Sequence, residues 1–180
     1  MVAKSLVKLI DEAIIPAVCL IVGKMAGLFL ASYFLNLSFM IKSSQVLWIL
    51  PSVHFANLTD YTIAENYSNL AMFFVASIGC MLVLVRAHFF HQSHIHPVLH
   101  AKLVKLNLEN LIAPTYHLYH QALIWLIFLW LTVGFLIIST LLQVTYPQIT
   151  IVAFIIASNF SWLFAVDVEK EIEILRTDNF

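Results

Sequence analysis

The sequence predicts an all-α integral membrane protein with four transmembrane helices and a cytoplasmic amphipathic helix between the second and the third. Composition is the first reason. The chain is 62% apolar and only 11% charged, whereas soluble domains are roughly 45–50% apolar and about 25% charged. A soluble core of this size cannot bury so much apolar surface. The second reason is that four segments approach the length of about 20 apolar residues that a bilayer requires.

The third and fourth predicted spans are the clearest. The third carries no charged residue, and the fourth follows a short turn that ends at Pro147. The second span runs past Arg86, whose long side chain can reach the interface from inside the bilayer. The four spans are predicted at residues 13–35, 70–90, 121–142 and 149–166.

The first span has two possible registers. Residues 13–35 place Lys24 near the middle of the bilayer, whereas residues 25–41 leave Lys24 and Lys42 at the two borders. We favour the first register, because residues 14–22 are too apolar to lie in water. A lysine in the bilayer costs about 2.5–3.5 kcal/mol or more, and the predicted spans offer no acidic residue at a matching depth.

The basic residues predict the orientation of the chain. With the amino terminus inside, the inner side holds seven of them and the outer side holds only Lys42, and such a bias marks the cytoplasmic side. The inner seven are Lys4, Lys8, Arg86, Lys102, Lys105, Lys170 and Arg176. We therefore expect one membrane domain, residues 1–180, in a plasma or inner membrane with both termini cytoplasmic. Its predicted parts besides the spans are an outer loop at 36–69, an inner histidine-rich loop at 87–120 and a cytoplasmic tail at 167–180.

The inner loop contains an amphipathic pattern. Leucines recur on one side of residues 98–112 while lysines, asparagines and a glutamate occupy much of the rest, which is typical of a helix at the membrane interface or on a partner. Pro97 suits the first position of that helix. We expect it to leave His96 as the cap and not on a common face with His100.

Seven of the eight histidines lie between His88 and His120. Two pairs are three residues apart and would each share a helix face, namely His88 with His91 and His117 with His120. Both pairs fall at the inner membrane boundary, so their imidazoles are candidates to bind zinc, copper or haem. No acidic residue lies within either pair, and the alternative is that these histidines are interfacial side chains.

Two polar residues within the spans are candidates for an ion path or for helix packing: Lys24 and Asn159. Asn159 needs a hydrogen-bond partner in lipid and is expected to face another helix. Lys24 lies beside Gly23 and Gly27, and Ala31 follows four residues later. Such a row of small residues lets helices approach closely, within one chain or between copies.

The leading hypothesis is a non-enzymatic protein that acts as an oligomerising or accessory subunit of a membrane assembly. No catalytic constellation is recognisable, and the formal net charge of −1 argues against nucleic acid as a partner. The expected partners are the lipid bilayer, further copies of the chain or other membrane subunits. One alternative is an oligomeric channel or a metal or proton transporter that uses Lys24 and the inner histidines. A second is a haem-binding electron carrier.

Overall fold

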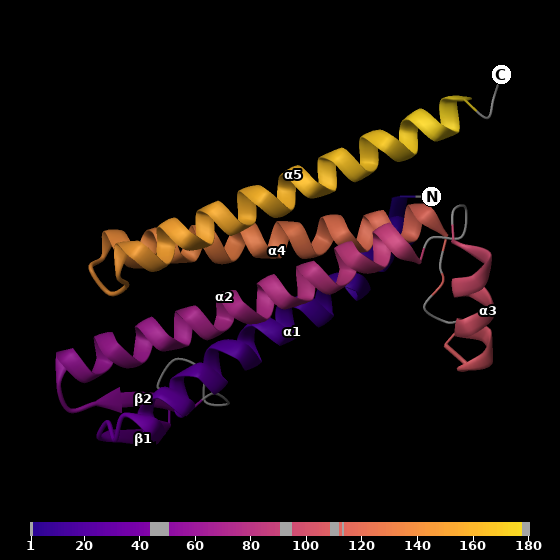
Figure 1. Cartoon of the computed structure of the whole chain (residues 1–180). Coiled ribbons are helices and arrows are strands. Elements are labelled where there is room, and N and C mark those ends of the chain that lie inside the picture. Colours follow the sequence, from indigo (N-terminus) through magenta and orange to yellow (C-terminus); the bar gives the residue numbers. More distant parts are fainter. Residues whose placement is uncertain (1, 44–50, 91–94, 109–111, 113, 178–180) are drawn as a thin grey trace.

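Four long helices and one short helix make up most of the structure (Figure 1). The computed structural model describes residues 2–43, 51–90, 95–108, 112 and 114–177. In chain order the elements are α1 (Val2–Phe34), β1 (Phe39–Ser43), β2 (Pro51–Phe55), α2 (Leu58–Phe89), α3 (Pro97–Lys105), α4 (Thr115–Leu141) and α5 (Pro147–Thr177). The two strands pair antiparallel, with Phe39 opposite Phe55.

The long helices each contain a segment that is long and apolar enough to cross a membrane. These segments are Ile10–Phe34, Leu58–Phe89, Tyr116–Leu141 and Pro147–Glu173. The prediction of four such helices is therefore confirmed, and they have the character of an integral membrane protein.

The segment predicted as an outer loop differs from the expectation. It contains the β1–β2 hairpin, so the chain is not wholly helical, and α2 begins at Leu58, well before residue 70. Asn36 adopts a positive φ of 51° just after α1, a conformation that commonly ends helices and that asparagine tolerates. Asp60 lies in the first turn of α2, where the helix dipole favours a negative charge.

The inner loop contains the short helix α3. Pro97 begins it and His96 is its N-cap, with Nδ1 accepting from the Val98 backbone nitrogen at 3.3 Å. The cap prediction is confirmed. The predicted helix to residue 112 is too long, because α3 ends at Lys105 and Asn107 has a φ of 54°. Residues 109–111 lie outside the described part of the chain.

The bundle has two distinct ends (Figure 1). The N-terminal end of α1, the C-terminal end of α5 and α3 lie at one end, which we call the terminal end. The β1–β2 hairpin and the α4–α5 turn (residues 142–146) lie at the other, which we call the hairpin end. Because α5 continues to Thr177, most of the predicted tail is helical.

Small residues bring α1 and α2 together. A Cβ added at Gly27 would lie 2.5 Å from the Ala71 Cβ and 3.0 Å from the Ser68 Cα, and one at Gly23 would lie 2.9 Å from a Val75 methyl group. All three distances are shorter than ordinary contacts, and at Gly27 the neighbours include backbone, so the close approach of the two helices requires glycine there.

The interior between the two ends is apolar. Trp125 of α4 packs directly on Gly79 of α2, where a Cβ would lie 2.0 Å from the indole ring. The α4–α5 contact adds hydrogen bonds from Trp130 Nε1 to Ser161 Oγ at 2.9 Å and between the hydroxyls of Thr140 and Thr150 at 2.6 Å. The core residues are Leu20, Met72, Phe73, Ala76, Cys80, Leu126, Leu129, Val133, Leu136, Ala153 and Ala157.

Candidate functional site

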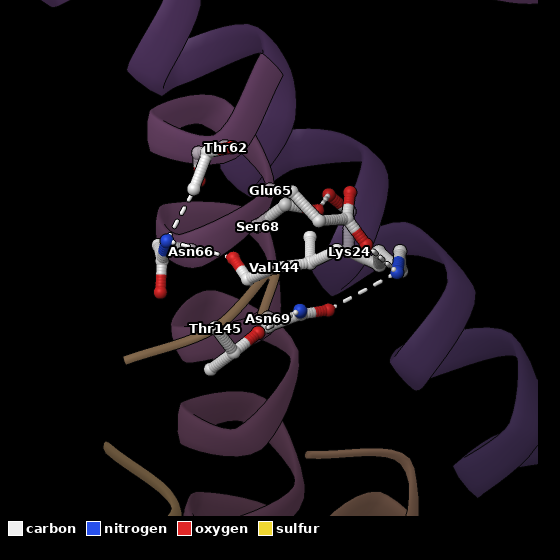
Figure 2. A network of polar contacts seen from close by, with 8 residues as sticks. All are labelled: Lys24, Thr62, Glu65, Asn66, Ser68, Asn69, Val144 and Thr145. Atoms are coloured by element: carbon white, nitrogen blue, oxygen red, sulfur yellow. Dashed lines mark hydrogen bonds and ion pairs between the residues drawn. The ribbon is translucent and has the colours of Figure 1, made fainter. Parts of the chain in front are cut away.

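Lys24 is the centre of a polar cluster near the hairpin end (Figure 2). Its Nζ lies 2.6 Å from Glu65 Oε1 and donates to Asn69 Oδ1 at 3.1 Å. The lysine side chain is 39% exposed and the glutamate side chain is 13% exposed. The ammonium group therefore has a carboxylate and an amide oxygen as partners from the neighbouring helix.

Asn66 and Asn69 connect this cluster to the α4–α5 turn. Asn69 Nδ2 donates to Thr145 Oγ1 at 3.0 Å. Asn66 Nδ2 donates to the Val144 carbonyl at 2.9 Å, and its Oδ1 accepts from the Tyr146 backbone nitrogen at 2.8 Å. Both asparagines are buried, and each uses both atoms of its amide. Helices α1 and α2 are thereby joined to the turn between α4 and α5.

The helical geometry of α2 explains why these side chains meet. Residues three and four apart share a helix face, and that spacing aligns Glu65 and Asn66 with Ser68 and Asn69. Ser68 Oγ donates to the Lys24 carbonyl at 2.7 Å, a hydrogen bond that the close approach at Gly27 permits. We call Lys24, Glu65, Asn66, Ser68 and Asn69 the hairpin-end cluster.

The expectation that Lys24 lacks an acidic partner in the other helices is wrong. Glu65 falls in the segment predicted as the outer loop, residues 36–69. The segment is instead the first part of α2, and it runs beside α1. The spacing of polar residues at 62, 65, 66 and 69 is the signal in the sequence that would have indicated a helix there.

The terminal end is held by histidine–carboxylate contacts. His88 Nδ1 of α2 lies 2.6 Å from Asp167 Oδ1 of α5. The other oxygen of Asp167 accepts from the Tyr119 hydroxyl of α4 at 2.8 Å. One carboxylate thus joins three helices, and its partners are an imidazole with a side chain 53% exposed and a phenol.

A second carboxylate joins α1 to α4 at the same end. Glu12 Oε2 lies 2.6 Å from His120 Nδ1, and Glu12 Oε1 lies 3.2 Å from His117 Nδ1. Tyr116 stacks on the His120 ring, with centroids 6.1 Å apart. We call the His88–Asp167 contact and the His117/His120–Glu12 contact the terminal-end pairs. Their acidic partners come from other helices, which spacing within each histidine pair does not reveal.

The terminal-end pairs form two separate groups in the structure. Among the described residues, no hydrogen bond, ion pair or ring contact joins His88 to His117 or His120, and no group of three or more His, Cys, Asp or Glu residues is arranged to hold a metal ion. His91 lies outside the described residues. Each terminal-end pair places a carboxylate beside the Nδ1 atom of imidazoles from another helix.

Asn159 does not meet Lys24. It is exposed on α5, and its Nδ2 donates to the Ile155 carbonyl of the same helix at 2.7 Å. Ala153 and Ala157 form the fully buried side of α5, and Asn159 lies away from that side.

The chemistry available at the two ends is different. Lysine, carboxylate and amide groups at the hairpin end make fixed hydrogen bonds between helices. Imidazole, carboxylate and phenol groups at the terminal end make side-chain contacts between helices. The apolar core separates the hairpin-end cluster from the terminal-end pairs.

No protein-family model, curated protein or solved structure matches this chain.

Proposed function

We propose that this chain is a small polytopic membrane protein that acts as an oligomerising or accessory subunit of a membrane assembly, without enzymatic activity of its own. The observation that carries the proposal is the use of its polar side chains. The hairpin-end cluster and the terminal-end pairs contact other helices of the same chain. Their groups stabilise the arrangement of helices, and the outward faces are left to interact with lipid and with other proteins.

The outward faces support this role. Large apolar side chains are exposed along each of the four long helices, for example Ile21 at 63%, Phe74 at 63%, Phe135 at 59% and Trp162 at 64%. In a membrane such faces contact lipid, and they are also the surfaces through which helices associate. A small chain with little mass outside its spans acts mainly through these faces.

The proposed orientation has both termini in the cytoplasm of a plasma or inner membrane. The basic residues favour it, and the two ends of the described chain lie at the same end of the bundle as α3 (Figure 1). In this orientation α3 is an interfacial helix on the cytoplasmic side. Its buried Leu103 and its exposed Lys102 fit that position.

Transport remains the second candidate, and a specific observation favours it. Lys24, Glu12 and Asp167 are ionisable groups within or beside the spans, each in contact with a second polar group. A path through one copy is opposed by the apolar core between the two ends. A transporter of this design would need a polar path between copies.

Sedimentation equilibrium in a density-matched mild detergent tests the proposal, because it reports protein mass alone. We expect a mass of two or more chains of 20.5 kDa, or of this chain with a second membrane protein. In parallel, proton and zinc flux into liposomes containing the purified protein should equal the flux into empty liposomes. A lone monomer would contradict assembly, and a flux abolished by Lys24→Met would favour transport.

A further inference from the structure

Helix α5 presents two faces of different character. Its bundle side is formed by Ala153 and Ala157, which are 0% exposed, together with the partly buried Phe160 and Phe164. The opposite side faces away from the bundle. Only 11% of the apolar window of α5 is buried, compared with 22% to 39% for the other three spans. Most side chains in this window of α5 therefore lie away from the other described elements.

The outward face of α5 carries a heptad pattern. Val152, Ile155, Asn159, Trp162 and Val166 are separated by three, four, three and four residues, which is the spacing of positions a and d in a coiled coil. Val152, Ile155 and Trp162 are 54%, 53% and 64% exposed. Asn159 falls at an a position with valines at the a positions before and after it. We call these five residues the α5 seam.

Asn159 is the polar member of the seam. Its Nδ2 donates to the Ile155 carbonyl, and its Oδ1 has no hydrogen-bond partner among the described residues. Asn66 and Asn69 differ, because both atoms of each amide have a partner. An amide carbonyl in lipid without a partner is costly. A second copy of the same amide offers both a donor and an acceptor.

The geometry points to a second copy of this chain as the occupant of the α5 seam, and the inference rests on the proposed function. Two copies with the same topology lie parallel in one membrane, and a 3.5-residue repeat gives a left-handed crossing. The two Asn159 side chains then meet at the same depth and exchange hydrogen bonds. Such an asparagine fixes register and favours a pair of helices.

The charges beyond the apolar part of the seam are also complementary between copies. Glu169 follows Val166 at the next d position, and Lys170 follows at the neighbouring e position, both exposed. In a parallel pair each d position lies beside the partner's e position. Each Glu169 can therefore face the partner's Lys170. The row of small residues on α1 is not available to a second copy, because α2 already covers Gly23 and Gly27.

Cysteine cross-linking of the full chain in membranes tests the seam. In a background with Cys19→Ala and Cys80→Ala, single cysteines are introduced at Ile155, Asn159 and Trp162. A lipid-soluble oxidant should convert these variants to disulfide-linked dimers at least fivefold more than the control variants. The matched controls are Phe154→Cys on another side of α5, Phe135→Cys on α4 and Leu82→Cys on α2, whose native side chains are 50%, 59% and 60% exposed. Equal cross-linking at seam and control positions would overturn the inference.

Substitution of Asn159 tests the role of its amide. Energy transfer between differently labelled copies, measured while the protein is diluted with lipid, reports the dissociation constant. Asn159→Val should weaken association about tenfold, since an interhelical hydrogen bond in a membrane contributes on the order of 1 kcal/mol or more. Asn159→Gln, which keeps the amide, should weaken it less. An unchanged dissociation constant for Asn159→Val would contradict the reciprocal hydrogen bonds.

The outcomes separate this inference from the proposed function. A complex that contains several copies, or a second membrane protein, but that does not cross-link through the α5 seam would overturn the inference and leave the proposed function in place. A monomer without protein partners would contradict both.

Discussion

The hairpin end and the terminal end of the bundle both join helices through polar side chains, but the groups differ. At the hairpin end, the asparagines Asn66 and Asn69 use both atoms of their amides and connect α2 to a backbone turn. At the terminal end, His88 and His120 contact the carboxylates of Asp167 and Glu12. The first set includes hydrogen bonds to backbone atoms of the turn, whereas the second joins side chains only.

This difference indicates which end holds the helices together more strongly. Amides bonded to backbone groups in a buried position are costly to remove, because each lost partner leaves a desolvated donor or acceptor. Side-chain pairs near the surface contribute less, because water replaces the lost partner. We expect substitutions near the hairpin end to destabilise the bundle more than those at the terminal end. The free energy of unfolding, from denaturation in mixed micelles, measures the difference.

The largest effect is expected for Lys24→Met. The substitution leaves the Glu65 carboxylate, which is 13% exposed, without its ammonium partner. We expect a loss of about 2–4 kcal/mol in the free energy of unfolding, between the values for exposed and fully buried pairs. The double variant Lys24→Met/Glu65→Leu should recover much of this loss. A double variant no more stable than Lys24→Met alone would contradict the ion pair as the cause.

Gly27→Ala should have the next largest effect. Its new Cβ would meet the Ala71 Cβ at 2.5 Å and the Ser68 Cα at 3.0 Å, so the two helices would have to move apart. We expect a loss of about 1–3 kcal/mol. Gly134→Ala is the matched control, because nothing lies within 4 Å of its Cβ position and alanine favours a helix by up to about 1 kcal/mol. Equal losses for the two variants would contradict close packing at Gly27.

Asn66→Ala removes the two hydrogen bonds that Asn66 makes to the α4–α5 turn. The Val144 carbonyl loses a donor and the Tyr146 nitrogen loses an acceptor, which should cost about 1–2 kcal/mol. Asn159→Ala provides the comparison, because Asn159 contacts only its own helix. In detergent at monomer dilution it should change the stability by less than about 0.5 kcal/mol. A larger loss of stability for Asn159→Ala than for Asn66→Ala would contradict the stabilising role of the Asn66 contacts.

Among the contacts between helices, the smallest effect is expected for His88→Gln at the terminal end. The His88 side chain is 53% exposed, and Asp167 keeps the Tyr119 hydroxyl as a donor. The loss should be below about 1 kcal/mol. His120→Gln should cost more than His88→Gln, because its side chain is only 25% exposed. A cost for His88→Gln that equals that of Lys24→Met would show that the two ends are held equally.

The four apolar helices could be predicted from the sequence, because a bilayer requires long apolar segments and these are visible in one dimension. The His96 cap could also be predicted, because proline favours the first position of a helix and Pro97 therefore makes the preceding residue the N-cap. The contacts of Glu65 and Asp167 could not be predicted, since they join helices far apart in the sequence. The early start of α2 was missed because polar residues at 65, 66 and 69 serve as buried contacts instead of marking a loop.

Asn159 shows the converse case. The sequence identified it as a polar residue that needs a partner in lipid, and the structure shows that α5 turns it away from the bundle. Which side of a helix faces the chain's own core depends on the small residues Ala153 and Ala157 and on the helices that pack there. A heptad on the remaining side became recognisable only once that packing was known.

The most direct test of the account is the mass of the protein complex extracted from its membrane in polymer nanodiscs, without detergent. We predict a particle whose protein mass is at least twice the 20.5 kDa of one chain, from further copies or from this chain with another membrane subunit. A particle that contains a single chain and lipid alone would contradict the central claim that this protein acts by assembling with others.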